Sequence, residues 1–273
     1  MKTKDFTFKS ATGVCDIYGC RYTPDDDAVK AVIAINHGMA EHQARYRDFV
    51  SFLTSNGFAV YMHDMANHGK SNNDKNLTGY FGKKDGYKAL VKDFDSVVKI
   101  AKTDYPDKKL VIMGHSMGSF IVRCYTAWYP NAGFDGAIYM GTGGSNPIAG
   151  VGDFVSSLIA KVTGYKKKVA LLDKMTFGSY NNKFEKRTAF DWLTRDNSVV
   201  DKYINDEYCG FLFSAQGMND LVKLNIYRFL LSAEQTTPFV IIQKALSKLK
   251  ISLKQRHIKM LQQSFITARA TKF

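Results

Sequence analysis

Residues 110–128 read Leu110-Val-Ile-Met-Gly-His-Ser-Met-Gly-Ser-Phe-Ile-Val-Arg-Cys-Tyr-Thr-Ala-Trp128. The apolar start of this stretch is typical of a buried strand, and its second half is typical of a helix. Between them lies a G-x-S-x-G motif, in the strand, turn and helix context that presents a nucleophilic serine. Gly114 and Gly118 permit the tight turn, and the helix N-terminus beside Ser116 favours developing negative charge. We therefore predict that Ser116 is a nucleophile.

Short apolar strands and amphipathic helices alternate around this stretch. Strand patterns occur within residues 4–22 and at residues 31–35, 58–62, 110–113 and 136–140. Apolar residues at helical spacing separate them, at residues 46–53 and 87–101. This alternation predicts an α/β fold with a mostly parallel, helix-covered sheet, in which chemistry gathers beyond the carboxyl ends of the strands.

The strand at residues 31–35 ends in Asn36-His-Gly-Met-Ala-Glu-His42, where an oxyanion-binding loop is needed. The pair His37-Gly38 lets the backbone turn so that the following amide faces the nucleophile. We predict that the N–H groups of Met39 and Met117 form an oxyanion hole. For His37 we expect a supporting role, in which its hydrogen bonds brace the loop.

Residues 37–42, 64–71 and 114–118 together resemble the monoacylglycerol lipase and lysophospholipase branch of the α/β-hydrolases, often grouped with the serine aminopeptidases. The likeness covers roughly residues 10 to 225 and departs at Asn67, where the family usually has glycine. The resemblance implies an α/β-hydrolase fold with a helical cap. It also implies hydrolysis of a small, lipid-like carboxylic ester of the monoacylglycerol or lysophospholipid class, without a metal or an organic cofactor.

The resemblance also bears on domain organisation and on which residues are scaffold. We expect a hydrolase core at residues 1–146, a helical cap at 147–225 and an atypical, basic, helix-rich segment at 226–273. Asp64 and His68 could be combined with Ser116 into a triad, but both precede it, whereas these enzymes have the order serine, acid, histidine. We interpret both residues as scaffold.

Charge and composition exclude several classes of protein. Of the net charge of +13, residues 231–273 carry +7, because they hold six Lys and two Arg against a single acid. With no zinc-finger spacing or RNA-binding signature beside this charge, no nucleic-acid partner is expected. The N-terminus has no apolar signal segment and no stretch is long enough to span a membrane, so a cytoplasmic protein is expected. The four cysteines form no C-x-x-C pair and are expected to be reduced thiols.

The C-terminal segment lacks the residues that should complete the site. After the cap, the family would supply an acid on a Gly-Asp-x-Asp-Pro-type loop and a histidine on a glycine-rich loop. No aspartate follows Asp220, no glycine follows Gly217, and the remaining histidine is His257. The last strands of the sheet are therefore expected to be missing or altered.

Three accounts of this segment are open. In the first, Ser116, Glu234 and His257 form a triad in the correct chain order, although His257 lies among cations that disfavour a charged imidazole. In the second, the chain is a catalytically impaired hydrolase whose basic tail contacts an anionic membrane surface or a partner. In the third, a shift of reading frame near residue 230 replaced the original C-terminus. The oligomeric state is not predicted.

Overall fold

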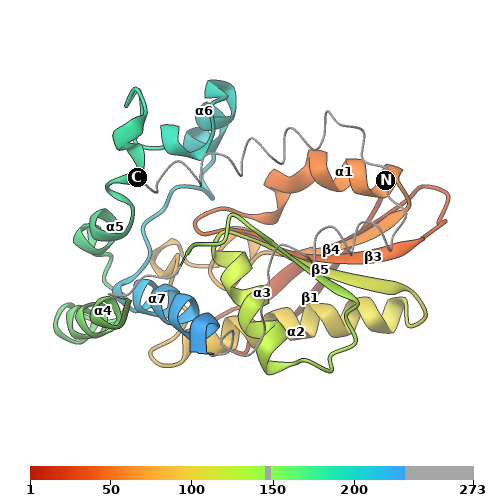
Figure 1. Cartoon of the computed structure of the whole chain (residues 1–273), viewed down its shortest axis with the longest axis horizontal. Coiled ribbons are helices and arrows are strands. Elements are labelled where there is room, and N and C mark those ends of the chain that lie inside the picture. Colours follow the sequence, from red (N-terminus) through yellow and green to blue (C-terminus); the bar gives the residue numbers. More distant parts are fainter. Residues whose placement is uncertain (145–148, 231–273) are drawn as a thin grey trace.

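The computed structural model describes residues 1–144 and 149–230, and a twisted sheet lies at its centre (Figure 1). The sheet has the strand order β1-β2-β4-β3-β5-β6. Its strands are β1 Lys2–Lys9, β2 Asp16–Thr23, β3 Ala31–Asn36, β4 Phe58–His63, β5 Lys109–His115 and β6 Gly136–Met140. Strands β4, β3, β5 and β6 pair in parallel, whereas β1 and β2 are antiparallel. The prediction of a mostly parallel sheet is confirmed.

Helices cover both faces of the sheet. Helix α1 (Arg47–Ser55) lies on one face, and α2 (Gly86–Asp104) and α3 (Met117–Trp128) lie on the other (Figure 1). Side chains of β3 alternate between two cores, with Val32 and Ala34 facing α2 and α3, and Ile33 and Ile35 facing the α1 side. All six residues of β3 are buried, which explains why the strand reads as a continuous apolar run.

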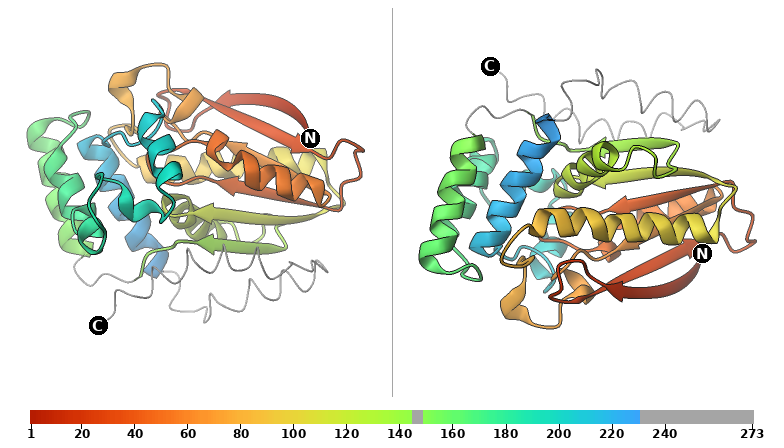
Figure 2. Two further views of the ribbon diagram at one scale, coloured as in Figure 1. Left: turned by 90° about the horizontal axis from the view of Figure 1, so that it is seen from above. Right: turned by 90° about the horizontal axis from the view of Figure 1, so that it is seen from below.

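A helical segment, residues 149–214, lies beyond one end of the sheet, and we call it the outer segment (Figure 2). It holds α4 (Ala149–Thr163), α5 (Ala170–Phe177) and α6 (Asn197–Asn205), with 3₁₀ turns at Tyr180–Lys183 and Asp191–Leu193. Other 3₁₀ turns occur at Gln43–Tyr46, Gly69–Ser71 and Lys75–Leu77. The domain division at residues 146 and 225 stays a prediction.

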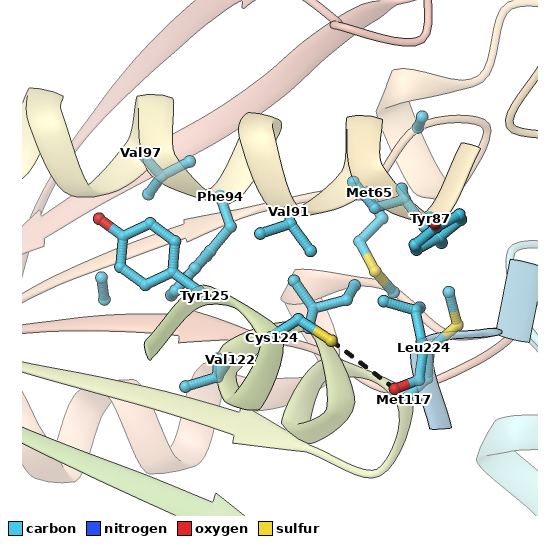
Figure 3. Packing of buried hydrophobic residues seen from close by; sticks show 14 of the residues in the cluster. Met65, Tyr87, Val91, Phe94, Val97, Met117, Val122, Cys124, Tyr125 and Leu224 are labelled. Carbon is cyan, nitrogen blue, oxygen red and sulfur yellow. Dashed lines mark hydrogen bonds between the residues drawn. The ribbon is translucent and has the colours of Figure 1, made fainter. Parts of the chain in front are cut away.

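Helix α7 (Ala215–Leu230) brings the chain from the outer segment back onto the core. Figure 2 shows it between α4 and the pair α2 and α3. Leu224 is fully buried beside α3, where its carbonyl accepts the Cys124 thiol at 3.7 Å, as Figure 3 shows. Met117, the first residue of α3, belongs to the same buried cluster. The first residue of α3, which follows Ser116, therefore packs in the same core as α7.

Several predictions depend on residues beyond this description. The last strands, the basic C-terminal helix, Glu234 and His257 all lie outside the described residues. All four cysteines lie among the described residues, and none of them is bonded to another cysteine. In residues 1–144 and 149–230, none of the helices combines the length and the apolar character needed to cross a bilayer.

Asp220 couples α7 to the start of α2, and its carboxyl group is fully buried. One oxygen accepts the Tyr87 N–H at 3.1 Å, and the other has no hydrogen-bond partner among the described residues. Burial raises the pKa of Asp220 to about 7, although the hydrogen bond from Tyr87 opposes this shift. In the folded protein Asp220 therefore keeps its proton up to about pH 7, whereas in the unfolded chain it loses this proton near pH 4.

We predict that the stability of Asp220→Asn, relative to that of the wild type, increases as the pH rises. Between pH 4 and 7 the wild type should lose up to about 1.4 kcal/mol of stability per pH unit through this group, a loss that asparagine avoids. The free energy of unfolding in urea, measured for both proteins at pH 5 and 7, should show the variant gaining on the wild type by about 2 kcal/mol. A difference that does not change with pH would contradict the buried, protonated carboxyl.

Candidate active site

Ser116 occupies the sharp turn between β5 and α3. Its backbone has φ 50° and ψ −118°, a region that costs a residue with a side chain about 1–3 kcal/mol. Its N–H donates to the Met140 carbonyl at 2.9 Å, and its carbonyl accepts the Ser119 N–H at 2.9 Å and the Ser119 hydroxyl at 2.5 Å. The strain is thus held in place by hydrogen bonds on both sides of the turn, as in the elbow of a nucleophilic serine.

The glycines of the motif stand where backbones touch. A Cβ at Gly114 would overlap the carbonyl oxygen of Gly118 and lie 2.7 Å from the Ser119 Cα. A Cβ at Gly118 would overlap the carbonyl oxygens of Asn36 and His37 at the end of β3. These contacts press the first turn of α3 against the loop that follows β3. The predicted nucleophile and the predicted oxyanion loop are therefore neighbours in space.

We predict that Gly118→Ala destabilises the fold by more than about 3 kcal/mol, because neither carbonyl can retreat without moving a strand. Gly150→Ala in α4 is the matched control, since a Cβ there meets nothing within 4 Å. The control should be neutral or more stable by about 0.5–1 kcal/mol, the usual gain from replacing glycine in a helix. Chemical denaturation of both variants tests this, and equal stabilities would contradict the proposed close approach.

His37 is fully buried and connects two loops. Its Nε2 accepts the Met65 N–H at 3.0 Å, so Nδ1 carries the proton and donates to the Gly38 carbonyl at 2.8 Å. Burial lowers the pKa of His37 to about 3, which keeps the ring neutral at physiological pH. A neutral ring with both nitrogens engaged is suited to holding the loop rather than to moving protons.

Glu41 anchors the other side of this loop. Its carboxylate, only 4 % exposed, accepts the Gly38 N–H at 2.6 Å and the Tyr46 hydroxyl at 2.8 Å, and it pairs with Arg45. His115 Nδ1 lies 2.9 Å from the Tyr46 hydroxyl and 3.3 Å from the Glu41 carboxylate. Burial alone would raise the pKa of Glu41, but the hydrogen bond and charge of His115 and the charge of Arg45 outweigh it and hold the pKa low. A charged carboxylate therefore links the loop to the residue before Ser116.

The predicted oxyanion donors lie on the two segments that meet at Gly118, the start of α3 and the loop after β3. Met117 is the first residue of α3, where helix N–H groups have no intrahelical partner, and Met39 follows the Gly38 N–H that Glu41 binds. In the described part of the chain, neither the Met39 nor the Met117 N–H has a hydrogen-bond acceptor. Two unengaged N–H groups beside a strained serine can stabilise an oxyanion.

Ala40 shows how the loop is fixed from the outer segment. Its φ is 50°, a left-handed conformation that is unfavourable for alanine. Its carbonyl accepts the Gly210 N–H at 3.0 Å and the buried hydroxyl of Tyr203 at 2.9 Å. Arg45 adds to this contact, because its guanidinium lies 4.8 Å from the centre of the Tyr203 ring. The strained turn next to Met39 is thus held by outer-segment residues.

We predict that Tyr203→Phe loosens this turn. Loss of one buried hydrogen bond should lower the free energy of unfolding by about 1 kcal/mol. If the turn places the Met39 N–H, the second-order rate of Ser116 modification by a fluorophosphonate should also fall. Tyr180→Phe, which changes a half-exposed ring elsewhere in the outer segment, is the control and should leave both quantities unchanged. A reaction rate equal to the wild type would show that oxyanion-hole geometry does not depend on this bond.

His63 ends β4, and Asp64 and His68 follow it; the burial of all three agrees with the scaffold role expected of Asp64 and His68. The Asp64 carboxylate accepts the N–H groups of Gln43 and Lys70, both at 2.8 Å. His63 and His68 are fully buried, and burial lowers the pKa of each to about 3. Asn67 adopts φ 54°, a conformation that asparagine tolerates better than most residues.

The catalytic acid and base that the sequence predicts are not among the described residues. Within residues 1–144 and 149–230, no histidine is hydrogen-bonded to the Ser116 hydroxyl. His257 and Glu234, the predicted base and acid, lie outside the described residues. The described residues do offer one group of metal-ligand type, made of His42, Asp206 and Cys209.

Comparison with known families decides where the chain belongs. A family model described as serine aminopeptidase, S33, matches residues 27–250. The chain belongs to this family. The match runs past residue 225, where the sequence resemblance was expected to end. It also agrees with the resemblance stated from the three loop motifs.

Two relatives of known name are lipases. The chain is 32 % identical over 169 residues to a monoacylglycerol lipase of Mycolicibacterium smegmatis, which is 61 % of this chain and 54 % of that protein. It is 26 % identical over 235 residues to the monoglyceride lipase of Mus musculus, covering 84 % of this chain and 69 % of that one. The chain thus spans little more than half the length of the mycobacterial relative.

A solved structure shows the same architecture. The carboxyl esterase of Bacillus coagulans, determined in complex with glycerol, matches with a TM-score of 0.75 and 27 % identity. The match covers 82 % of this chain and 73 % of the esterase. The predicted α/β-hydrolase fold is confirmed.

Proposed function

We propose that this S33-family chain is a serine hydrolase that cleaves carboxylic esters through an acyl-enzyme on Ser116. The observation that carries the proposal is the strained turn at Ser116, which Gly118 places against the loop of Met39, whose N–H has no acceptor among the described residues. The names of the lipase and esterase relatives support the same reaction class.

In the proposed mechanism, the Ser116 hydroxyl oxygen attacks the ester carbonyl while a base takes its proton. The resulting oxyanion accepts hydrogen bonds from the N–H groups of Met39 and Met117. Collapse releases the alcohol with the returned proton, and water, activated by the same base, then cleaves the acyl-enzyme. We assign the base to His257 and its orienting acid to Glu234, the residues whose chain order fits this family.

A lipid-like substrate is proposed from the outer segment, which we interpret as the cap over the site. Its helices α4 and α5 expose large apolar side chains, with exposed fractions of 50–78 % at Val151, Phe154, Leu158, Val162, Leu171 and Met175. On α4 these residues are spaced by three or four and so form one stripe. An exposed apolar face of this kind suits contact with aggregated lipid. The monoacylglycerol or lysophospholipid class and the cytoplasmic location stay proposals.

A second function follows if no base reaches Ser116. The chain would then bind lipid-like esters and turn them over slowly at most. Such a protein would keep the oxyanion hole and could retain a rate about 10³–10⁴ above that in water. Weak hydrolysis alone therefore does not separate the two functions.

The test is hydrolysis of a monoacylglycerol by the full-length chain and its variants. Ser116→Ala should lower kcat by at least about 10³, because the acyl-enzyme cannot form. Ser96→Ala is the control, since this half-buried serine of α2 donates its hydroxyl to the Lys92 carbonyl of its own helix. His257→Ala should lower kcat by a similar factor if His257 is the base.

The outcomes are distinct. Wild-type turnover in Ser116→Ala would reject the proposed reaction. Full activity in His257→Ala, together with loss in Ser116→Ala, would reject only the assigned base. A folded wild type that binds the ester but hydrolyses it no faster than Ser116→Ala would establish the binding function instead.

A further inference from the structure

Three potential metal ligands meet where the outer segment touches the oxyanion loop. They are His42, at the end of that loop, and Asp206 and Cys209, on the turn after α6. Their ligand atoms all lie within 4.8 Å of one another, and His42 Nε2 is 2.8 Å from Asp206 Oδ2. We call these residues the His42–Asp206–Cys209 cluster.

The backbone of the turn aims two of these side chains the same way. The Cys209 N–H donates to the Asp206 carbonyl at 3.0 Å, which closes a turn with the two ligands three residues apart. This spacing is one that zinc sites use when two ligands come from one turn. The Tyr208 N–H donates to Asp206 Oδ1 at 2.9 Å and so leaves Oδ2 directed at His42. The carboxylate is therefore oriented before any ligand arrives.

The geometry needs only small movements to hold a metal. Bond lengths of about 2.0–2.3 Å in a tetrahedral zinc site place ligand atoms roughly 3.3–3.6 Å apart. Side-chain rotations that move the ligand atoms by about 1 Å would bring them to these separations. The His42 and Asp206 side chains are 13 % and 28 % exposed and border a surface hollow of about 800 Å³. An ion can therefore reach them from solvent.

The surrounding charge permits a cation. Burial and the charge of Asp206 raise the pKa of the Cys209 thiol to about 12, so a cation must displace the thiol proton as it binds. Arg45 and Glu41 act on Cys209 in opposite directions and form an ion pair with each other. Lys202 lines the hollow together with the acids Asp201 and Glu207, and Glu207 is paired with Lys75. The cluster itself would supply one carboxylate and one thiolate, which balance a divalent ion.

We propose that the His42–Asp206–Cys209 cluster is a binding site for a divalent cation of the zinc class, with water as the fourth ligand. Imidazole, carboxylate and thiolate are the donors that zinc prefers. Binding replaces the hydrogen bond between His42 and Asp206 by two metal bonds, and it displaces the proton of the Cys209 thiol to solvent. The metal then joins the oxyanion loop to the outer segment, three residues after Met39.

The proposal does not depend on ester hydrolysis, because it concerns a contact between two loops. It is tested by titrating Co²⁺ into the untagged, full-length protein after a chelator has removed bound metal. One equivalent should bind and produce the near-ultraviolet absorption of a thiolate bound to Co²⁺, and Zn²⁺ should displace it. Cys209→Ser should lack this absorption, and His42→Gln should bind at least tenfold more weakly.

Cys15→Ser is the matched control. Cys15 is half-buried like Cys209, but among the described residues it belongs to no group of three metal-ligand side chains. Its absorption spectrum with Co²⁺ should equal that of the wild type. If Cys209→Ser fails to fold, as judged by circular dichroism, Asp206→Asn takes its place and should also bind more weakly. A wild type without the thiolate absorption, or an absorption that survives in Cys209→Ser, would overturn the proposal.

Discussion

The close approach of α3 to the end of β3 is the constraint on which the rest of the site depends. Gly118 lies against the carbonyl groups of Asn36 and His37, and no side chain fits between them. This contact fixes the strained turn at Ser116 and brings the loop of Met39 beside it. The hydrophobic core also stabilises the turn at Ser116, because the next residue, Met117, belongs to the same buried cluster as Leu224 of α7. Strain at a functional residue is thus sustained by packing around it.

The oxyanion loop depends equally on contacts from distant parts of the chain. Glu41 holds the Gly38 N–H from within the loop, whereas Tyr203 and Gly210 hold the Ala40 carbonyl from the outer segment. A movement of the outer segment would therefore shift the Ala40 carbonyl. Since one peptide group separates this carbonyl from the peptide that carries the Met39 N–H, the N–H would move too. If the outer segment is the proposed cap, it would then act on the proposed chemistry as well as on substrate access. The proposed metal site lies on the same connection.

The sequence predicted the parts of the structure that local patterns control. Buried parallel strands are apolar on both faces, and β3 to β6 were predicted within two residues of their observed ends. The elbow could be predicted because G-x-S-x-G stood between a strand and a helix. The sequence did not predict the hydrogen bonds that hold the site in place. Glu41 and Tyr46 bond to each other and Tyr46 to His115, which is distant along the chain, as Tyr203 is from Ala40. Such contacts depend on packing between segments, which periodicity does not reveal.

The central claim is that Ser116 and the N–H groups of Met39 and Met117 form one catalytic unit. A crystal structure of the full-length protein after reaction with a long-chain phosphonate ester tests it directly. We predict a phosphorus bonded to the Ser116 hydroxyl oxygen, with one phosphonyl oxygen about 2.7–3.1 Å from both amide nitrogens. An unmodified Ser116, or an adduct whose oxygen faces away from Met39 and Met117, would contradict this account.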